Sequence, residues 1–199
     1  METIRLTTWI DAPVERCFLL SLSIDLHVVS ARKTGEKAID GVTTGLIREG
    51  ETVTFQGRHF GMRRRHTSRI ETLRPYSYFR DVMVAGAFRR FEHEHHFAPM
   101  DDGTRMRDEV RFSVPCGALG RLATKMFVRK HLAALLVERN RVIKRVAESE
   151  EWRRYLDGEV VGRTPKPVRG VTAGGVTAER WDAKALLAHS RMAVPPRHG

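Results

Sequence analysis

The stretch Ile10-Asp11-Ala12-Pro13-Val14-Glu15-Arg16-Cys17-Phe18 marks the change from a strand to a helix and sets the order of the elements that follow. Before it, apolar and polar residues alternate from Ile4 to Ile10, a period of two that is typical of a half-buried strand. Pro13 suits the first position of a helix, and Glu15 near that end is favoured by the helix dipole. The sequence therefore predicts a strand and then a short helix from Pro13 to about Ser21.

The following part of the chain changes from helical to strand-like patterns. A second helical turn is expected over Asp25–Val29. From Glu36 to Val114, alternating segments are separated by glycines, prolines and the acidic turn Asp101-Asp102-Gly103, which predicts an antiparallel meander. The apolar parity changes near Gly57 and Gly61, so a bulge is expected at one of these glycines.

A long helical segment follows Pro115-Cys116-Gly117 and continues to about Glu150 without an internal proline. On a helical wheel its apolar residues fall into two phases. One phase holds Leu119, Leu122 and Met126, and the other holds Val128, Leu132, Leu135, Leu136, Val142, Ile143 and Val146. This change of phase predicts a bend, or two successive helices, near Met126 to Lys130.

Length and composition predict one folded domain and a tail. The chain has 199 residues, of which 41% are hydrophobic and 30% charged, as in globular proteins. Its longest aliphatic run, Leu132–Val137, is too short to span a membrane, and the first residues carry no signal-peptide pattern, so we expect a cytoplasmic protein. Residues 1–156 form the predicted domain. Residues 157–199 are expected to be a flexible tail, with a short amphipathic helix over 178–192.

The chain is strongly basic, with a net charge of +11 and an isoelectric point near 10.4. Residues 1–156 hold 28 basic and 20 acidic residues and therefore +8 of this charge. Such a balance is compatible with nucleic acid, anionic lipid or acidic small molecules as partners. Nucleic acid is disfavoured because Glu71 shares the strand face of Arg63 and Arg65, and because no recognition-helix, zinc-finger or RNP-type pattern is present.

The predicted order of elements is that of the helix-grip fold, and the quoted stretch Ile10–Phe18 resembles the opening signature of the SRPBCC superfamily. That superfamily contains START-related lipid-transfer proteins and polyketide cyclase/dehydrase proteins. Further stretches resemble a bacterial ligand-binding-like subgroup: Gly50–Phe55 with Arg58–Gly61, Gly86–His93 and Arg139–Lys144. The resemblance covers about residues 3–150. It implies an α+β fold in which a curved antiparallel sheet wraps around a long C-terminal helix and encloses a cavity.

One departure from the superfamily pattern bears on the ligand. Many members have a Pro-Trp pair after the first helices, whereas this chain has His27-Val28-Val29. A ligand assignment that depends on that aromatic residue therefore does not transfer to this chain.

Polar residues on otherwise apolar faces are the candidate site residues, because a buried polar group must be paired or used. Asp108 lies on an apolar strand face, and Arg139 lies at the centre of the apolar stripe of the long helix. Two interpretations of Arg139 are open: a buried ion pair with Asp108, or a guanidinium presented to a ligand carboxylate or enolate. A third is an arginine whose head reaches solvent along its stem.

Three histidines share such faces. His93 and His95 face the same way, and His66 lies on another apolar face. They are expected to be hydrogen-bonded core residues or cavity-wall residues, or general acid/base groups together with Asp108. A metal site would need a third ligand such as His66 or Asp108, which no spacing fixes, so no metal and no cofactor are predicted.

The sequence thus predicts a protein that binds a hydrophobic small molecule, such as a lipid or polyketide, with an acidic or carbonyl group. The predicted ligand-binding residues are Trp9, Phe55, Met62, His66, Phe91, His93, His95, Phe97, Asp108, Phe112, Leu135 and Arg139. The alternative is a polyketide cyclase/dehydratase-like enzyme with Asp108, His93 and His95 as catalytic candidates. A histidine or Asp108 that is free in the cavity with a shifted pKa would favour the enzyme. The sequence makes no prediction of oligomeric state.

Overall fold

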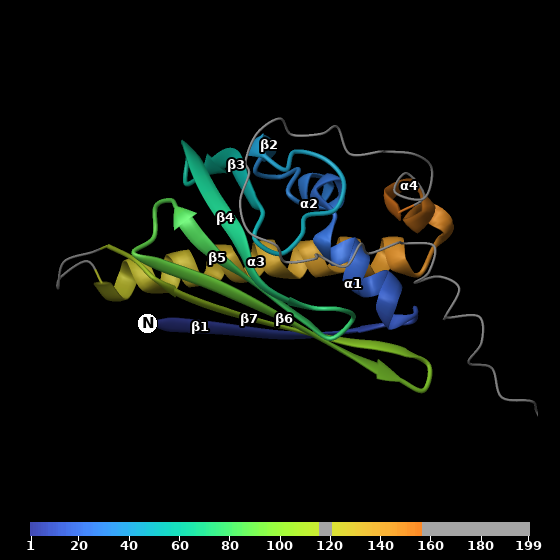
Figure 1. The fold of residues 1–199 in the computed structure, drawn as a ribbon. Coiled ribbons are helices and arrows are strands. Elements are labelled where there is room, and N and C mark those ends of the chain that lie inside the picture. The colour runs from blue at the N-terminus through green and yellow to red at the C-terminus, as the bar shows by residue number, and fades with distance from the viewer. Residues whose placement is uncertain (116–120, 157–199) are drawn as a thin grey trace, which may run out of the picture. The chain divides into compact units, whose positions relative to one another are not determined.

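The computed structural model describes residues 1–115 and 121–156. One seven-stranded antiparallel sheet has the order β1-β7-β6-β5-β4-β3-β2, so β2 to β7 form a continuous meander and β1 pairs with its last strand (Figure 1). The strands are β1 (Glu2–Ile10), β2 (Lys37–Gly41), β3 (Thr52–His59), β4 (Met62–Arg74), β5 (Tyr78–Ala85), β6 (Arg90–Met100) and β7 (Gly103–Ser113). The predicted meander is confirmed.

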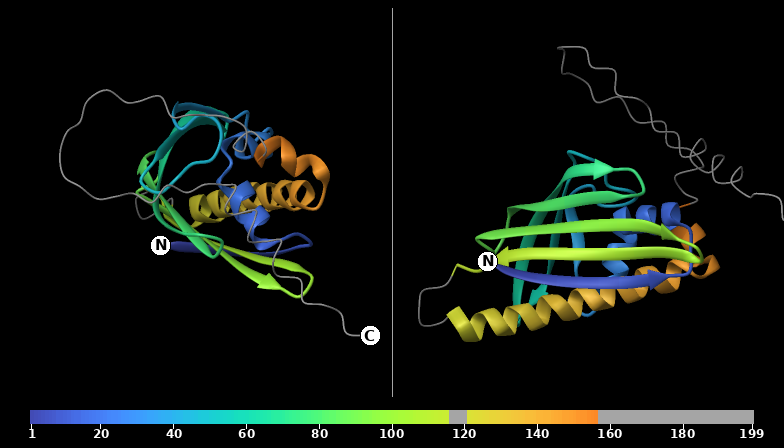
Figure 2. Two further views of the ribbon diagram at one scale, coloured as in Figure 1. Left: turned by 45° about the vertical axis from the view of Figure 1, so that its right-hand side comes forward. Right: turned by 90° about the horizontal axis from the view of Figure 1, so that it is seen from below.

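The helices are α1 (Val14–Leu22), α2 (Ile24–Ser30), α3 (Arg121–Ala147) and α4 (Arg153–Leu156), with the 3-10 turn η1 (Glu150–Trp152) before α4. The sheet curves, and α3 runs along its concave side, in contact with β1, α1 and α2 (Figures 1 and 2). This arrangement is the helix-grip α+β fold that the sequence predicted.

The first two helices form where the sequence predicted them. Pro13 precedes α1, whose buried side chains are those of Cys17, Phe18, Leu20 and Leu22. Ser23 separates the two helices, and its hydroxyl accepts a hydrogen bond from the backbone N–H of Leu26, which caps α2. Burial raises the pKa of the Cys17 thiol to about 11, so this cysteine is a packing residue.

The main core lies between α1, the sheet and the C-terminal half of α3. Phe18 makes edge-to-face contacts with Phe79 and Phe97, whose ring centroids lie 5.8 and 5.4 Å away. A second, smaller cluster contains Ile4, Val110, Phe112, Val128 and Leu136. The side chains of the two clusters pack together beside the cavity described below.

The prediction of a bulge at Gly57 or Gly61 is wrong, because β3 and β4 pair without a shift in register. Phe60 and Gly61 have positive φ angles of 55° and 77°, and they form the two-residue turn that joins β3 to β4. Gly57 pairs regularly with Arg64. Its lack of a side chain is needed because a Cβ there would lie 2.5 Å from Cγ of Glu36. The change in apolar parity is therefore caused by the hairpin turn between β3 and β4.

The predicted division of the long helix is also wrong, since α3 is continuous from Arg121 to Ala147. Of the residues in the first apolar phase, Leu119 lies outside the described residues and Met126 is exposed. Phe127, which follows Met126, is exposed as well. The change of phase on the helical wheel thus arises because apolar side chains near the start of α3, such as those of Met126 and Phe127, lie outside the core.

The predicted tail, including its helix over 178–192, lies outside the described residues, as does Cys116. Within the ranges 1–115 and 121–156, none of the helices combines the length and the apolar character needed to cross a membrane.

Candidate ligand-binding cavity

A cavity of about 440 Å³ lies inside the curve of the sheet, and residues of α2 and α3 also line it. This volume falls in the range of small-molecule sites, roughly 300 to 1,000 Å³. Its wall is predominantly apolar. The apolar lining includes Leu22, Ile24, Ile47, Val53, Phe55, Ile70, Phe79, Phe88, Phe91, Val110, Leu132, Leu135 and Leu136.

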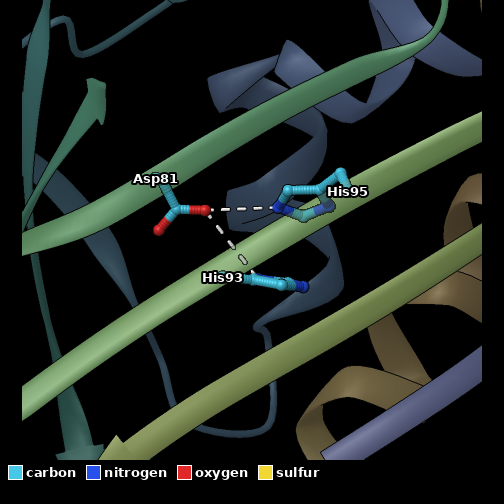
Figure 3. Close-up of side chains that lie close together, drawn as sticks. All are labelled: Asp81, His93 and His95. Atoms are coloured by element: carbon cyan, nitrogen blue, oxygen red, sulfur yellow. Dashed lines mark hydrogen bonds and ion pairs between the residues drawn. The ribbon is translucent and has the colours of Figure 1, made fainter. Parts of the chain in front are cut away.

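The wall carries a cluster of ionisable side chains from β5, β6, β7 and α3, which we call the Asp108 cluster: Asp81, His93, His95, Asp108 and Arg139. Strand register brings these residues together. Asp81 is opposite His93 across β5 and β6, and His95 is opposite Asp108 across β6 and β7. Figure 3 shows Asp81 facing both imidazole rings.

Asp108 is the centre of this cluster and is completely buried. Its Oδ1 lies 2.9 Å from both His93 Nε2 and His95 Nδ1, and its Oδ2 accepts a 2.6 Å hydrogen bond from Asn140. Burial opposes ionisation, but the hydrogen bond from His93 and the close imidazole of His95 hold the pKa of Asp108 well below its usual range. The carboxylate is therefore ionised.

Arg139 connects the Asp108 cluster to the cavity. Its Nη1 lies 3.6 Å from Asp108 Oδ1, and its Nη2 donates a 3.1 Å hydrogen bond to the carbonyl of Ser21 in α1. The side chain also lines the cavity and is 13% exposed. Both interpretations of Arg139 thus have a structural basis, since one guanidinium pairs with Asp108 and reaches the cavity wall.

Every ring nitrogen of His93 and His95 faces a carboxylate oxygen. His93 directs Nε2 at Asp108 and Nδ1 at Asp81, 3.8 Å away. His95 Nε2 lies 3.2 Å from Asp81, whereas its buried Nδ1 faces Asp108 without hydrogen-bonding geometry. Burial lowers the pKa of His93 to about 4, so this ring is neutral at pH 7.

His66 extends the polar wall along β4. Its Nε2 lies 3.0 Å from the hydroxyl of Ser68, which donates a 3.3 Å hydrogen bond to Asp81. Gly86 lies against the other side of the ring, where a Cβ would be 3.1 Å from His66 Nδ1. Burial lowers the pKa of His66 below its ordinary value, so the ring is neutral at pH 7.

A second polar cluster, the Glu36 cluster, lines the same cavity and consists of His27, Glu36, His59 and His131. Glu36 accepts from His27 and His59, with nitrogen–oxygen distances of 3.1 and 3.2 Å, and His59 Nδ1 lies 3.1 Å from His131 Nε2. Burial opposes ionisation of Glu36, yet the hydrogen bonds from His27 and His59 hold its pKa far below the ordinary value.

The sequence analysis missed this cluster because its members come from α2, a loop, the end of β3 and α3. The one available signal was His27-Val28-Val29 in place of the Pro-Trp pair. In the structure the ring of His27 stacks on Phe55 on the cavity wall, with the ring centroids 4.1 Å apart.

The Glu36 cluster predicts a pH dependence of stability. Because the folded-state pKa of Glu36 lies below the unfolded value of about 4.3, its ionisation stabilises the fold above that pH and loses this effect as the pH falls. We expect wild-type stability to fall more steeply than that of Glu36→Gln between about pH 5 and 3, by up to about 1.4 kcal/mol per pH unit. Urea unfolding at several pH values measures both, and parallel curves would contradict the assignment.

The cavity wall contains seven of the predicted ligand-binding residues: Phe55, His66, Phe91, His93, His95, Leu135 and Arg139. Asp108 lies behind the two histidines, with no exposed surface. The structure adds Asp81, the Glu36 cluster and Arg64 to the wall.

Four of the residues predicted to bind the ligand do not line the cavity, so their assignment to the cavity wall is wrong. Trp9 is 56% exposed because it has the opposite parity to Ile4 and Ile10 on β1, and Met62 is 50% exposed because it directly follows the hairpin turn. Phe97 is buried in the main core against Phe18, and Phe112 in the second cluster. The last two fill the core beside the cavity.

Comparison with family models finds no match, and comparison with curated proteins finds none either. Solved structures do match. The di-domain ARO/CYC StfQ from the steffimycin biosynthetic pathway is 12% identical with a TM-score of 0.58, over 75% of this chain and 52% of that one. A START superfamily protein from Mycobacterium smegmatis is 10% identical with a TM-score of 0.54, over 73% and 97%.

The major latex-like protein 151 from Panax ginseng is 12% identical with a TM-score of 0.54, over 74% of this chain and 98% of that chain. At these identities the likeness establishes the fold. The residues that define a ligand must therefore be argued from the cavity itself.

Proposed function

We propose that this chain, which has the helix-grip fold of START-related SRPBCC proteins, binds one hydrophobic small molecule in its cavity. The observation that carries the proposal is Arg139, a cation held on a predominantly apolar wall. Apolar walls with a few converging polar groups are typical of small-molecule sites. The apolar body of the ligand would contact the wall, and a carbonyl or carboxylate oxygen would accept from Arg139.

Arg139 has donors to spare for such an oxygen. A guanidinium carries five N–H groups. Asp108 and the Asn140 side-chain oxygen lie at Nη1, the Ser21 carbonyl lies at Nη2, and the side chain still borders the cavity. A lipid or polyketide with one polar end fits this distribution, since Arg64 and Arg65 add positive charge elsewhere on the lining.

The state of the histidines favours binding over acid/base catalysis of the polyketide cyclase/dehydratase kind. A general acid or base must lie within hydrogen-bond reach of the reacting group. Both ring nitrogens of His93 and of His95 face carboxylates, and Asp108 is behind them. None of these three sequence-based catalytic candidates is therefore free in the cavity.

Nucleic-acid binding gains no support from the arginines of the outer sheet face. Arg5, Arg107 and Arg111 all surround Glu109, with nitrogen–oxygen distances between 2.7 and 3.1 Å. Their charge is partly neutralised within the sheet, as in a solvated surface network.

Native mass spectrometry of the purified full chain, followed by organic extraction, tests the proposal. We expect the folded protein to carry one small molecule that denaturation releases, with an apolar body and a carbonyl or carboxyl oxygen. Leu135→Trp places bulk on the cavity wall and should reduce the retained molecule at least tenfold. Val137→Trp, on the exposed side of the same helix, is the matched control and should retain it.

Two results would count against the proposal. One is a wild-type protein that is always free of ligand and does not bind the apolar fluorophore 1-aminoanthracene. The other is equal retention by Leu135→Trp and Val137→Trp while both remain folded by circular dichroism.

A further inference from the structure

The contacts of Asp81, His93 and His95 have the spacing of ligands around one metal ion. Asp81 Oδ2 lies 3.2 Å from His95 Nε2 and 3.8 Å from His93 Nδ1. All three candidate ligand atoms lie within 4.8 Å of one another. Zinc-type ions bind nitrogen and carboxylate oxygen at about 2.0 to 2.2 Å, which separates adjacent ligand atoms by roughly 3 to 3.5 Å.

From this geometry we infer that Asp81, His93 and His95 bind a divalent first-row transition-metal ion on the cavity wall. Two imidazoles and one carboxylate suit zinc, cobalt or ferrous iron, whereas calcium and magnesium prefer oxygen ligands alone. The three side chains line the cavity, so the remaining coordination positions face the space where a ligand would lie.

Asp108 supplies the second independent observation. Metal-bound histidines usually donate their other ring N–H to a carboxylate or carbonyl oxygen, which fixes the tautomer. The other nitrogens of the two rings, Nε2 of His93 and Nδ1 of His95, each lie 2.9 Å from the same Asp108 oxygen. Asp108 is itself held by Asn140 and Arg139 from α3.

The hydrogen-bond pattern without a cation is incomplete. In its neutral form an imidazole has one N–H donor and one lone pair. His93 uses its donor toward Asp108, so its Nδ1 lone pair faces the Asp81 carboxylate; the buried Nδ1 of His95 has no hydrogen bond. A cation bound by Asp81 and by Nδ1 of His93 replaces this repulsive contact between a lone pair and a carboxylate with two metal–ligand bonds, and Nε2 of His95 is placed to supply a third.

The charge around the site also favours a cation. Two carboxyl groups, those of Asp81 and Asp108, lie here with one guanidinium, that of Arg139. The other described side chains that bond to these carboxyl groups include the uncharged Asn140 and Ser68. A divalent cation among these groups, next to Arg139, favours an oxygen-bearing ligand.

The sequence analysis predicted no metal because spacing did not fix a third ligand. It considered His66 and Asp108, whereas the structure brings in Asp81 through the register of β5 against β6. His66 faces Ser68 and lies outside this set, and Asp108 lies behind the rings.

Cobalt binding to the untagged full chain tests the site. After treatment with a chelator and removal of bound lipid, we expect one Co²⁺ or Zn²⁺ per chain, measured by calorimetry and by the visible absorption of Co²⁺. Magnesium should not compete. Asp81→Asn and His95→Gln should each weaken cobalt binding at least tenfold. His96→Gln is the matched control, because His96 is on the same strand but its side chain is 42% exposed and faces Glu94.

A second measurement does not depend on the variants folding. In nitrogen-15 spectra of the zinc-loaded chain, we expect His93 to be ligated through Nδ1 and His95 through Nε2, with the opposite nitrogens protonated. Binding below one ion per chain, equal loss in His96→Gln, or no change in these two rings would overturn the inference. Cobalt binding is measured without a hydrophobic ligand, so a chain that does not bind cobalt does not contradict the proposed function. Likewise, a chain that retains no hydrophobic molecule does not contradict the metal site.

Discussion

Replacing Asp108 by leucine is expected to lower the free energy of unfolding by about 3 to 5 kcal/mol, the cost of removing one partner from a buried charge pair. Asp108 has no exposed surface and contacts His93, His95, Asn140 and Arg139. Leucine is larger than aspartate, so any overpacking at this fully buried position adds to the loss. The main loss comes from a buried guanidinium left without its carboxylate and from two donors, His93 and Asn140, left without their acceptor.

The measurement is urea unfolding with a chelator present, so that no bound metal contributes to either state. Asp101→Leu is the control, because this exposed acid lies between β6 and β7 and its replacement should change stability by less than about 0.5 kcal/mol. A loss below 1 kcal/mol for Asp108→Leu would show that Asp108 does not hold α3 to the sheet.

The fold was predictable because its signals are local. The strand period before Pro13, the turn residues between the strands and the long proline-free segment each depend on neighbouring residues alone. Side-chain parity also identified Asp108, His93 and His95, since a polar residue within an apolar alternation points to the inside of the sheet.

The site was only partly predictable because its remaining members depend on register and on loops. Asp81 has no unusual local pattern, and only its pairing opposite His93 brings it to the cluster. Glu36 lies in a loop before β2 and approaches His59 because Gly57 leaves room for it. Trp9 shows the opposite error: an aromatic residue was assigned to the cavity although its strand parity places it outside.

The likeness to solved structures establishes the fold, whereas Arg139 is the feature that selects a class of ligand. One fold can serve many functions, so the fold and an apolar lining alone do not select a ligand class. In this chain the cation is fixed by Asp108 and Ser21 on two different elements, β7 and α1. A guanidinium held in this way is preorganised, which reduces the ordering cost of binding an oxygen acceptor.

Replacing Arg139 by leucine is therefore expected to weaken the binding of oleate by about 10- to 100-fold, because a hydrogen bond to a charged group contributes about 1.5 to 3 kcal/mol. Binding of 1-aminoanthracene, which has no oxygen, should change less than threefold, since the apolar wall stays in place. Fluorescence titration with this probe, followed by displacement with oleate, measures both affinities in one experiment.

The controls separate the role of the charge from that of the fold. Arg139→Lys keeps a cation and should retain part of the oleate affinity. Arg141 lies two residues further along α3 with a 62% exposed side chain, so Arg141→Leu should leave the oleate affinity unchanged. Arg139→Leu also leaves Asp108 without its cation, so each variant is first shown to be folded by circular dichroism. A folded Arg139→Leu protein with wild-type oleate affinity would mean that Arg139 serves only the ion pair, because the two probes differ in the oxygen acceptor that this guanidinium is proposed to bind.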